Sequence, residues 1–335
     1  MQSEEVRPWI TSPIGESSVA VISCSHESGW AAAMGRPGSH FHRSMALPNF
    51  LVLGAQKAGT TSLHKYLAQH PEIFMSREKE PHYFSLGDTA GPPPPRDAFV
   101  AESLSGYERL FDRVRGEVAI GESSTTYLDS ARAAQRIAER LPDVKLIAIL
   151  RDPAGRAHSQ YVFNRKRMLE DAPTFARALS LESQRLAAGV GARYAYRAKG
   201  FYAAQLEVYL RFFDRSQLRV FLYEDLAEAP TTLFRDIFGF LGVDEGFVPD
   251  TRLRYNVSGV PRNAAAATLL RLVGPVRPWL EAWTPAALMS RVGRPLIVSQ
   301  REDPVLRRQL VEDYREDILR LEAMIGRDLA AWRSY

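Results

Sequence analysis

Short apolar runs alternate along this chain with segments whose apolar positions recur every three or four residues. The runs with the composition of buried strands are residues 50–53, 118–121, 145–150 and 218–223. Segments of helical periodicity begin at residue 60 and cover residues 97–114, 130–140, 201–213, 231–241 and 304–332. Continuous apolar strands are typical of parallel sheets that are covered on both faces, with helices as the crossovers. The pattern therefore predicts an α/β fold with a central parallel sheet, helices on both faces and a C-terminal helical segment.

The first strand runs directly into a glycine-bounded turn. Gly54 and Gly59 bound the turn, and Thr60, Thr61 and Ser62 follow at the start of the next helical segment. Glycine allows backbone N–H groups to approach an anion closely, and a helix start adds unpaired donors and a partial positive charge. The segment therefore predicts a P-loop-type element, in which a strand, a phosphate-binding loop and a helix follow one another.

The lysine of this loop is displaced from the position that nucleotide triphosphatases use. A Walker A loop places lysine directly after the second glycine, where it reaches the β- and γ-phosphates. Here Thr60 follows Gly59, and the lysine of the turn is Lys57. The loop can still hold a 5′-phosphate, but the positive charge of Lys57 lies inside the turn and not directly after the second glycine.

A second anion-binding element follows the strand predicted at residues 145–150. Ligands of dinucleotide size span the sheet at its switch point, so a second strand end should contribute to the site. Arg151 can bind a phosphate through two parallel hydrogen bonds, and Ser159 adds a neutral donor. Pro153 suits the first turn of a helix, on which Arg156 lies one turn before Ser159 and is expected to be structural. The alternative for Arg151 is a cation at a strand end in a surface salt bridge.

These segments resemble the sulfotransferases that use 3′-phosphoadenosine-5′-phosphosulfate (PAPS), of the heparan-sulfate type and of bacterial sulfotransferase domains. Residues 57–63 fit the family pattern K-x-G-T-[ST]-[ST/A]-L, and residues 151–159 fit R-[DN]-P-x-x-R-x-x-S. The resemblance covers about residues 48–262. It implies that PAPS is the sulfuryl donor, that Arg151 and Ser159 hold its 3′-phosphate, and that the 5′-phosphosulfate loop consists of Lys57, Ala58, Gly59, Thr60, Thr61 and Ser62.

The resemblance also implies a loop that closes over the nucleotide. Related sulfotransferases carry a basic residue in a late loop, and residues 255–263 hold the candidate, Arg262. Ser258 and Gly259 would shape the turn. The alternative is an ordinary surface loop between helices.

The candidate base lies in the segment Lys79-Glu80-Pro81-His82-Tyr83-Phe84. It resembles the E-x-[HQ]-F-F pattern of heparan-sulfate-type enzymes, which implies that Glu80 takes the proton of the acceptor hydroxyl. Burial against Tyr83 and Phe84 would raise the pKa of Glu80, and a nearby Lys79 would oppose that rise. His82 is the second candidate base. The alternative is that Glu80 is one more solvated charge in the run 77–80.

The resemblance gives Lys57 the role of stabilising charge on the leaving phosphate. The chain departs from the family pattern after the next strand. Many heparan-sulfate enzymes carry E-K-[ST]-P-x-Y there, and their lysine also serves the site. Here Ser123 stands at the lysine position and Thr125 at the proline position. The arrangement with two lysines is therefore absent, so we do not expect close functional identity with those enzymes.

Residues 47–335 are expected to form a single domain, with a nucleotide-binding core at about 48–262 and helices at 264–335. Residues 1–46 are rich in Ser, Gly and Pro without steady periodicity, so we expect a flexible N-terminal extension, in which Met45 is an alternative start of the protein. Four prolines at 92–95 predict a stiff connector.

Composition narrows the function classes. The 335 residues are 45% hydrophobic, as in a globular protein, and the formal net charge of +4 suits a polyanionic cofactor without requiring nucleic acid. The single cysteine, Cys24, excludes an intrachain disulfide, and no apolar run reaches membrane-spanning length. No cluster of residues has metal-site spacing, and the chemistry requires no metal. We expect a cytoplasmic protein that binds no nucleic acid and has no membrane span.

The sequence predicts a sulfotransferase acting on a hydroxyl or amine of a carbohydrate or small-metabolite acceptor. The acceptor pocket is expected within residues 160–200, whose basic side chains either attract an anionic acceptor or form a solvated face. Neither the acceptor nor the oligomeric state follows from the sequence. Two alternatives are a P-loop kinase that uses ATP and Mg²⁺, and a catalytically silent nucleotide-binding protein. The missing lysine after Gly59 argues against the kinase, and the presence of both Lys57 and Glu80 argues against the silent protein.

Overall fold

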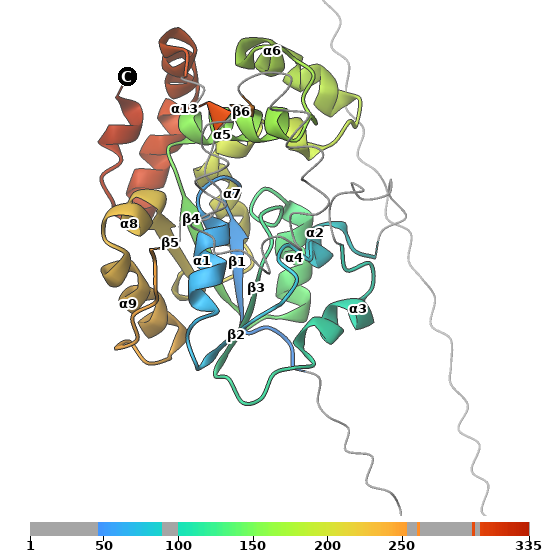
Figure 1. The fold of residues 1–335 in the computed structure, drawn as a ribbon, viewed down its shortest axis with the longest axis vertical. Coiled ribbons are helices and arrows are strands. Elements are labelled where there is room, and N and C mark those ends of the chain that lie inside the picture. Colours follow the sequence, from blue (N-terminus) through green and yellow to red (C-terminus); the bar gives the residue numbers. More distant parts are fainter. Residues whose placement is uncertain (1–45, 89–99, 253–259, 262–296, 299–301, 335) are drawn as a thin grey trace, which may run out of the picture. The chain divides into compact units, whose positions relative to one another are not determined.

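The computed structural model describes residues 46–88, 100–252, 260–261, 297–298 and 302–334 (Figure 1). The predicted N-terminal extension, the proline run at 92–95 and the loop with Arg262 therefore lie outside the described residues. So do residues 264–296, which form much of the predicted C-terminal helical segment.

A five-stranded sheet forms the centre of the fold, with the strand order β2-β3-β1-β4-β5. Its neighbouring strands all pair in parallel. The strands are β1 (Phe50–Gly54), β2 (Ile73–Met75), β3 (Ala119–Ser123), β4 (Lys145–Leu150) and β5 (Leu218–Leu222). Among the described residues beyond this sheet, β6 (Val260–Pro261) and β7 (Ile297–Val298) form a separate antiparallel pair. The predicted α/β fold with a parallel sheet is thus confirmed.

Helices cover both faces of this sheet. Alternate residues of the strands enter different hydrophobic clusters: Leu51 and Leu53 belong to one, and Phe50 and Val52 to the other. The longer helices are α1 (Thr60–Leu67), α4 (Ala131–Arg140), α5 (Pro153–Lys166), α6 (Phe175–Ala187), α7 (Tyr202–Tyr209), α8 (Tyr223–Glu228), α9 (Pro230–Leu241) and α13 (Pro304–Ile325). Side chains of α4, α5, α7 and α13 pack in the cluster with Leu51, whereas those of α1 and α9 pack in the cluster with Phe50. Burial on both faces explains why the central strands are apolar without alternation.

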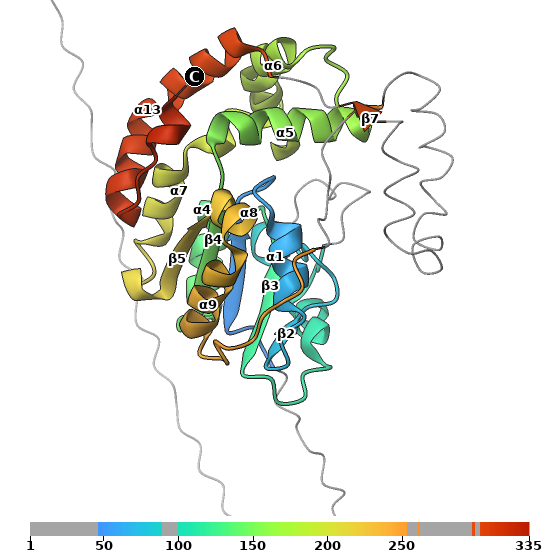
Figure 2. The same ribbon diagram turned by 60° about the vertical axis from the view of Figure 1, so that its left-hand side comes forward.

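The register of the central strands places three loop starts at one edge of the sheet. Phe50 of β1 lies opposite Gly121 of β3 and Lys145 of β4, and the parallel pairing puts the carboxyl ends of all three strands at the same edge of the sheet. The N–H of Ala55, just after β1, donates to the carbonyl of Ile149 over 2.6 Å. Helix α5 begins directly after β4 and crosses beyond the carboxyl ends of the strands (Figures 1 and 2). Any site at this edge is therefore covered by α5.

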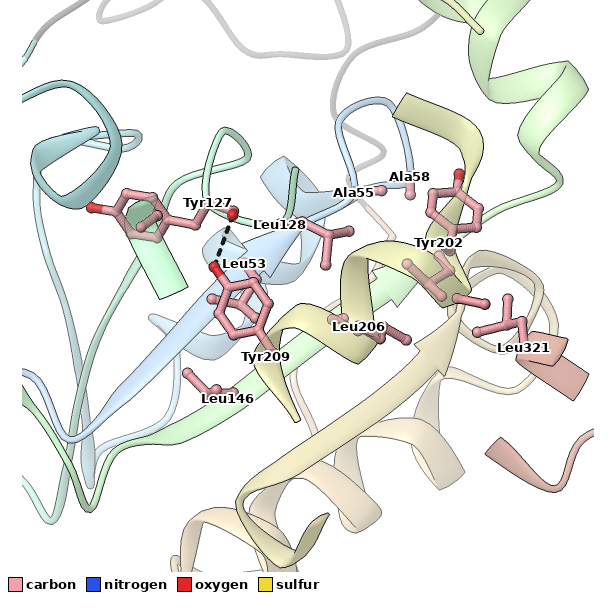
Figure 3. Close-up of a cluster of buried hydrophobic side chains, with 14 of the residues drawn as sticks. Leu53, Ala55, Ala58, Tyr127, Leu128, Leu146, Tyr202, Leu206, Tyr209 and Leu321 are labelled. Carbon is pink, nitrogen blue, oxygen red and sulfur yellow. Dashed lines mark hydrogen bonds between the residues drawn. The ribbon is translucent and has the colours of Figure 1, made fainter. Parts of the chain in front are cut away.

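The cluster beneath this edge joins the loop after β1 to α7. Figure 3 shows Ala55 and Ala58 of that loop in the cluster that also holds Tyr202 of α7. The hydroxyl of Tyr209 donates to the carbonyl of Tyr127 over 2.8 Å. The loop therefore packs against a buried cluster in which Tyr209 and Tyr127 are joined by a hydrogen bond.

The long C-terminal helix forms as the periodicity predicts. Helix α13 starts with Pro304 at its first turn, and Asp303 accepts a hydrogen bond from the N–H of Val305. It ends at Gly326, which has a left-handed φ of 64°. Its side chains at three- and four-residue spacing are buried, namely Leu310, Tyr314, Ile318 and Leu321. This side of α13 therefore faces the core.

Several boundaries differ from the predicted ones, and some elements were missed. The helix expected at 97–114 is reduced, within its described part, to α3 (Leu104–Glu108) and a 3₁₀ turn, Arg109–Phe111. The helix expected at 201–213 stops at Tyr209. Strand β2 was missed because three residues are too few to show a period, and α6 was missed in a segment considered only for its charges. In these segments tertiary packing outweighs local pattern.

The contact between Gly121 and Phe50 gives a test of the register of β1 and β3. A Cβ atom on Gly121 would lie 2.3 Å from the ring of Phe50, which is fully buried. We expect Gly121→Ala to lower the free energy of unfolding by about 1–3 kcal/mol, measured by urea denaturation. Gly106→Ala in α3 is the control, because its nearest neighbour is the movable hydroxyl of Ser103 at 3.3 Å. Alanine should be neutral there or stabilise by up to about 1 kcal/mol. Equal effects of the two changes would contradict the described register.

Candidate functional site

The loop after β1 has the backbone shape that an anion-binding turn requires. Lys57 and Gly59 adopt left-handed φ angles of 70° and 90°. The N-cap residue of α1 is Gly59, which has no side chain to accept hydrogen bonds from the first N–H groups of the helix. Thr60 is buried, whereas Thr61 and Ser62 are partly exposed. The loop and the helix start thus present backbone donors and hydroxyls at the carboxyl edge of the sheet.

Lys57 extends from this loop toward α5. Its Nζ lies 4.1 Å from the ring centroid of Phe163. Burial lowers the pKa of Lys57 to about 8, and the positive charges of Lys166 and Arg151 lower it further, whereas Glu80 acts in the opposite direction. The ammonium is therefore still mostly protonated at neutral pH, but it is poorly solvated. A cation in such surroundings interacts strongly with charge that develops near it.

Arg151 and Ser159 lie at the same edge as the loop. The guanidinium of Arg151 lies 5.2 Å from the ring centroid of Tyr223. The same Tyr223 ring packs against Gly59, because a Cβ there would come within 3.0 Å of it. Ser159 precedes Phe163 by four residues, so both lie on the side of α5 that faces Lys57. The structure thus brings together the loop, Arg151 and Ser159, as the two sequence motifs require.

Asp152 and Arg156 in the second motif have other partners. Asp152 caps α5 by accepting hydrogen bonds from the N–H groups of Ala154 and Gly155, and it also forms an ion pair with Arg307 of α13 at 2.6 Å. Arg156 is fully buried and donates to the side chain of Gln160 and to the carbonyl of Tyr196. Arg156 is therefore structural, as the sequence predicted. No sequence pattern indicated the role of Arg307, because the contact joins residues 155 positions apart.

Glu80 is held in place from the end of β3. Its backbone N–H donates to the carbonyl of Ser123 over 2.9 Å, and the hydroxyl of Thr125 donates to its Oε2 over 2.9 Å. Its Oε1 accepts from Nζ of Lys79 at 2.6 Å. Glu80 and His82 both have left-handed φ angles, 65° and 54°. Strained backbone of this kind persists where surrounding bonds fix it, and it is frequent at functional sites.

The charges around Glu80 keep it ionised. Burial raises its pKa, but Lys79, then His82, and the hydrogen bonds from Lys79 and Thr125 together lower the pKa below its usual value. The rings of Tyr83 and Phe84, which were expected to bury Glu80, pack against Tyr107. Lys79 was expected to oppose the rise in the pKa of Glu80 only if its amine were close. The amine is close, and the pKa of Glu80 is lowered overall.

His82 lies beside the candidate base. Its Nδ1 is 2.9 Å from the hydroxyl of Thr126, and its Nε2 is 3.5 Å from Oε2 of Glu80. Burial lowers the pKa of His82, partly offset by the negative charge of Glu80, while Lys79 and Lys199 lower it further. The imidazole is therefore mainly neutral at pH 7 and suited to orienting the carboxylate. Thr125 and Thr126 were considered in the sequence only for their family positions, although a hydroxyl cluster directly after a strand was a usable signal.

Position 123 carries no charge in this site. The hydroxyl of Ser123 lies 3.0 Å from Nδ1 of His64. Burial, with Lys79 and Lys65, lowers the pKa of His64 to about 3, so this imidazole is neutral at physiological pH. The pair forms a neutral hydrogen bond where the family pattern has a lysine.

Glu122 is a second carboxyl group behind the site, which the sequence analysis did not single out. It is fully buried and accepts hydrogen bonds from the hydroxyls of Tyr107 over 3.2 Å and Ser124 over 2.9 Å. Ser124 in turn accepts from the N–H of His82 over 3.0 Å. Burial raises the pKa of Glu122 to about 7, although hydrogen bonds from Tyr127, Ser124 and Tyr107 act to lower it. Glu122 therefore anchors the segment that carries Glu80 and His82.

The basic side chains of residues 160–200 are largely engaged. Lys199 is only 7% exposed and lies 3.4 Å from Asp129. Arg197 pairs with Asp313 at 2.9 Å, and Arg165 donates to the carbonyl of Glu170. Lys199 is thus not part of a solvated face, and its charge acts on His82. The acceptor pocket expected in this segment stays a prediction.

Comparisons with known proteins indicate the family and the fold. Residues 48–247 match the sulfotransferase family. The solved structure of a sulfotransferase from Alicyclobacillus acidocaldarius is 35% identical, with a TM-score of 0.68, and the match covers 86% of this chain and 100% of that one.

Curated relatives match over part of their length. A membrane-associated sulfotransferase, kil1, from Dictyostelium discoideum is 34% identical over 36% of this chain and 24% of its own length. A mouse heparan sulfate glucosamine 3-O-sulfotransferase, 3B1, is 29% identical over 64% of this chain and 50% of its own length. This chain thus spans half or less of these two relatives. Within the described residues, no helix is long and apolar enough to cross a membrane.

The burial of Glu122 predicts a pH-dependent contribution to stability. Its pKa is about 7 in the folded protein against an ordinary 4.5, so the folded state holds this proton more tightly than the unfolded chain. The contribution of Glu122 to the free energy of unfolding is therefore greatest below pH 4.5 and falls by on the order of 3 kcal/mol as the pH rises to 7. We expect Glu122→Gln to remove this dependence.

The measurement is urea denaturation at several pH values, with the variant subtracted from the wild type so that other groups cancel. Glu139→Gln on the exposed side of α4 is the control and should follow the wild type at every pH. A difference between wild type and Glu122→Gln that stays constant from pH 4.5 to 7.5 would show that Glu122 titrates normally.

Proposed function

This chain belongs to the sulfotransferase family, and we propose that it transfers a sulfuryl group from PAPS to a hydroxyl or amine of a carbohydrate or small metabolite. The observation that carries the proposal is the meeting of three groups at one edge of the sheet. These are the loop with Lys57 after β1, the pair Arg151 and Ser159 after β4, and Glu80 held by the end of β3.

The donor site that we propose uses both halves of this edge. Backbone N–H groups at the start of α1, with Thr60, Thr61 and Ser62, would hold the 5′-phosphosulfate. Arg151 and Ser159 would hold the 3′-phosphate through charge-assisted and neutral hydrogen bonds. The Tyr223 ring, which contacts both Gly59 and Arg151, fixes the relation between the two halves. Arg262 stays a candidate for closing the site.

The chemistry that we propose is an in-line displacement at sulfur. The acceptor oxygen or nitrogen forms a bond to sulfur while the bond from sulfur to the bridging oxygen of the 5′-phosphate breaks. Glu80 takes the proton of the acceptor, and adenosine 3′,5′-bisphosphate leaves with the bonding electron pair on its phosphate. Lys57 would stabilise the charge that develops on this oxygen. The lowered pKa of Glu80 supports its role as a base that is already ionised at neutral pH.

A carbohydrate is the acceptor class that we favour, because several relatives are named as heparan sulfate sulfotransferases. The alternative of a kinase with ATP and Mg²⁺ has less support. Thr60 occupies the position of the Walker lysine, and the ammonium of Lys57 lies over Phe163.

Donor binding gives the first test of the proposed function. We expect adenosine 3′,5′-bisphosphate to raise the melting temperature more than ATP with Mg²⁺ at equal concentration. Arg151→Met should weaken the binding of adenosine 3′,5′-bisphosphate about 10- to 100-fold, because it removes a charge-assisted contact to phosphate. Arg252→Met is the control, since Arg252 is 87% exposed and pairs with Asp250. Stronger stabilisation by ATP would favour the kinase instead.

Removing the candidate base gives the second test. We expect Glu80→Gln to lower kcat by about 10²- to 10⁴-fold while adenosine 3′,5′-bisphosphate still binds normally. Transfer from ³⁵S-labelled PAPS to a panel of oligosaccharides, alcohols and amines measures the rate. Glu78→Gln, an exposed neighbour, should keep wild-type activity. A Glu80→Gln variant as active as Glu78→Gln would exclude Glu80 as the base and leave His82 as the next candidate. Donor binding without transfer to any acceptor would favour the silent protein.

A further inference from the structure

Lys79 contacts the candidate base more closely than any sequence pattern indicated. Its Nζ lies 2.6 Å from Oε1 of Glu80, and its side chain is only 16% exposed. The other carboxylate oxygen, Oε2, accepts from the hydroxyl of Thr125 over 2.9 Å. Both oxygens of the carboxylate thus accept hydrogen bonds from groups on two different segments, which fixes the plane of the carboxylate.

The contact between Lys79 and Glu80 depends on an unusual backbone. The left-handed φ of 65° at Glu80 is costly for a residue with a Cβ atom, by about 1–2 kcal/mol. The hydrogen bond from the N–H of Glu80 to Ser123 and the one from the N–H of His82 to Ser124 hold this conformation. Strain that is over-determined by surrounding bonds points to a function for the geometry it maintains.

The end of β3 does not supply a cation to Glu80. Ser123 is paired with the neutral imidazole of His64, and Ser124 with Glu122 and the N–H of His82. The ammonium that contacts Glu80 therefore comes from its own sequence neighbour. Lys57 experiences the charges of both Glu80 and Lys79, so the three groups form one electrostatic cluster beneath α5.

We propose that Lys79 is a positioning residue for sulfuryl transfer, which orients the Glu80 carboxylate and maintains it as the free base. The inference rests on the proposed function. A carboxylate has about four lone-pair positions, and Lys79 and Thr125 occupy two of them, so positions remain for the acceptor hydroxyl. When Glu80 takes the proton, its ion pair with Lys79 is lost. Lys79 therefore lowers the basicity of Glu80, but it keeps the Glu80 carboxylate ionised and oriented.

Other charged and titratable groups also face Glu80. Lys57 approaches from the loop after β1, His64 from α1, His82 from the same segment and Glu122 from β3. None of these residues is replaced in the Lys79 variants, although the pKa values of Lys57, His64 and His82 should rise when the ammonium that lowers them is removed. Loss of the ammonium alone should therefore raise the pKa of Glu80, because burial then acts against the ionised form with less opposition.

The experiment compares Lys79→Met and Lys79→Gln, which remove the charge, with Lys79→Arg, which keeps it. Lys65→Met removes a charge from the exposed side of α1 and is the matched control. The first measurement is a ¹³C NMR titration of the Glu80 carboxyl in protein with labelled glutamate, assigned by its loss in Glu80→Gln. It needs neither donor nor acceptor. The second is the pH profile of sulfate release or transfer from labelled PAPS, with adenosine 3′,5′-bisphosphate binding as the check on the donor site.

We expect the titration midpoint of Glu80 and the acid limb of the rate profile to move to higher pH in both neutral variants. Lys79→Arg and Lys65→Met should keep the wild-type midpoint. Loss of orientation should lower kcat of the neutral variants about 10- to 100-fold, with little change in binding of adenosine 3′,5′-bisphosphate. An unchanged Glu80 midpoint in folded Lys79→Met and Lys79→Gln would overturn the proposal. If the Glu80 midpoint moves in the neutral variants but the wild-type protein does not bind adenosine 3′,5′-bisphosphate, the contact between Lys79 and Glu80 is supported and the proposed function is refuted.

Discussion

The parallel pairing of β1 with β3 and β4 is the constraint on which the rest of this structure depends. Because the three strands run in the same direction, the segments that follow them all start at one edge of the sheet. The bond from the N–H of Ala55 to Ile149 ties the start of the anion-binding loop to the strand that leads into Arg151. Residues that are distant in sequence thus become neighbours through the sheet alone. Helix α5 then covers the edge and contributes Ser159 and Phe163.

Burial at this edge disfavours the charged forms of both Lys57 and Glu80. Lys57 is desolvated enough to lower its pKa to about 8, yet it stays mostly protonated at neutral pH. Glu80 is also desolvated, which alone would favour its neutral form, but Lys79 and His82 outweigh that effect. The site therefore keeps the Lys57 ammonium and the Glu80 carboxylate charged although burial disfavours the charged form of each. Charges held in such surroundings are effective because they need little reorganisation during the reaction.

The sequence predicted the parts of this site that depend on local pattern. Strand β4 was predicted with its observed bounds, since Lys145 and the five consecutive apolar residues after it lead into a charged pair and Pro153. The loop from Gly54 to Gly59 followed from its glycines and hydroxyls. The contacts that hold Glu80 from the end of β3 could not be predicted, because Ser123 and Thr125 are more than 40 residues away in the sequence. The burial of Lys199 beside Asp129 was missed for the same reason, as charge in a sequence does not reveal whether a partner lies opposite.

The two carboxyl groups near the end of β3 show how one short segment creates two environments. Glu122 is enclosed by hydroxyl donors and has a raised pKa, whereas Glu80 contacts an ammonium and has a lowered one. Opposite shifts in neighbouring acids separate a structural role from a chemical one. Ser124 connects them, since it donates to Glu122 and accepts from the N–H of His82. With serine at position 123, the cation that contacts the base comes from Lys79. The loss of one family lysine therefore does not leave Glu80 without a positive neighbour.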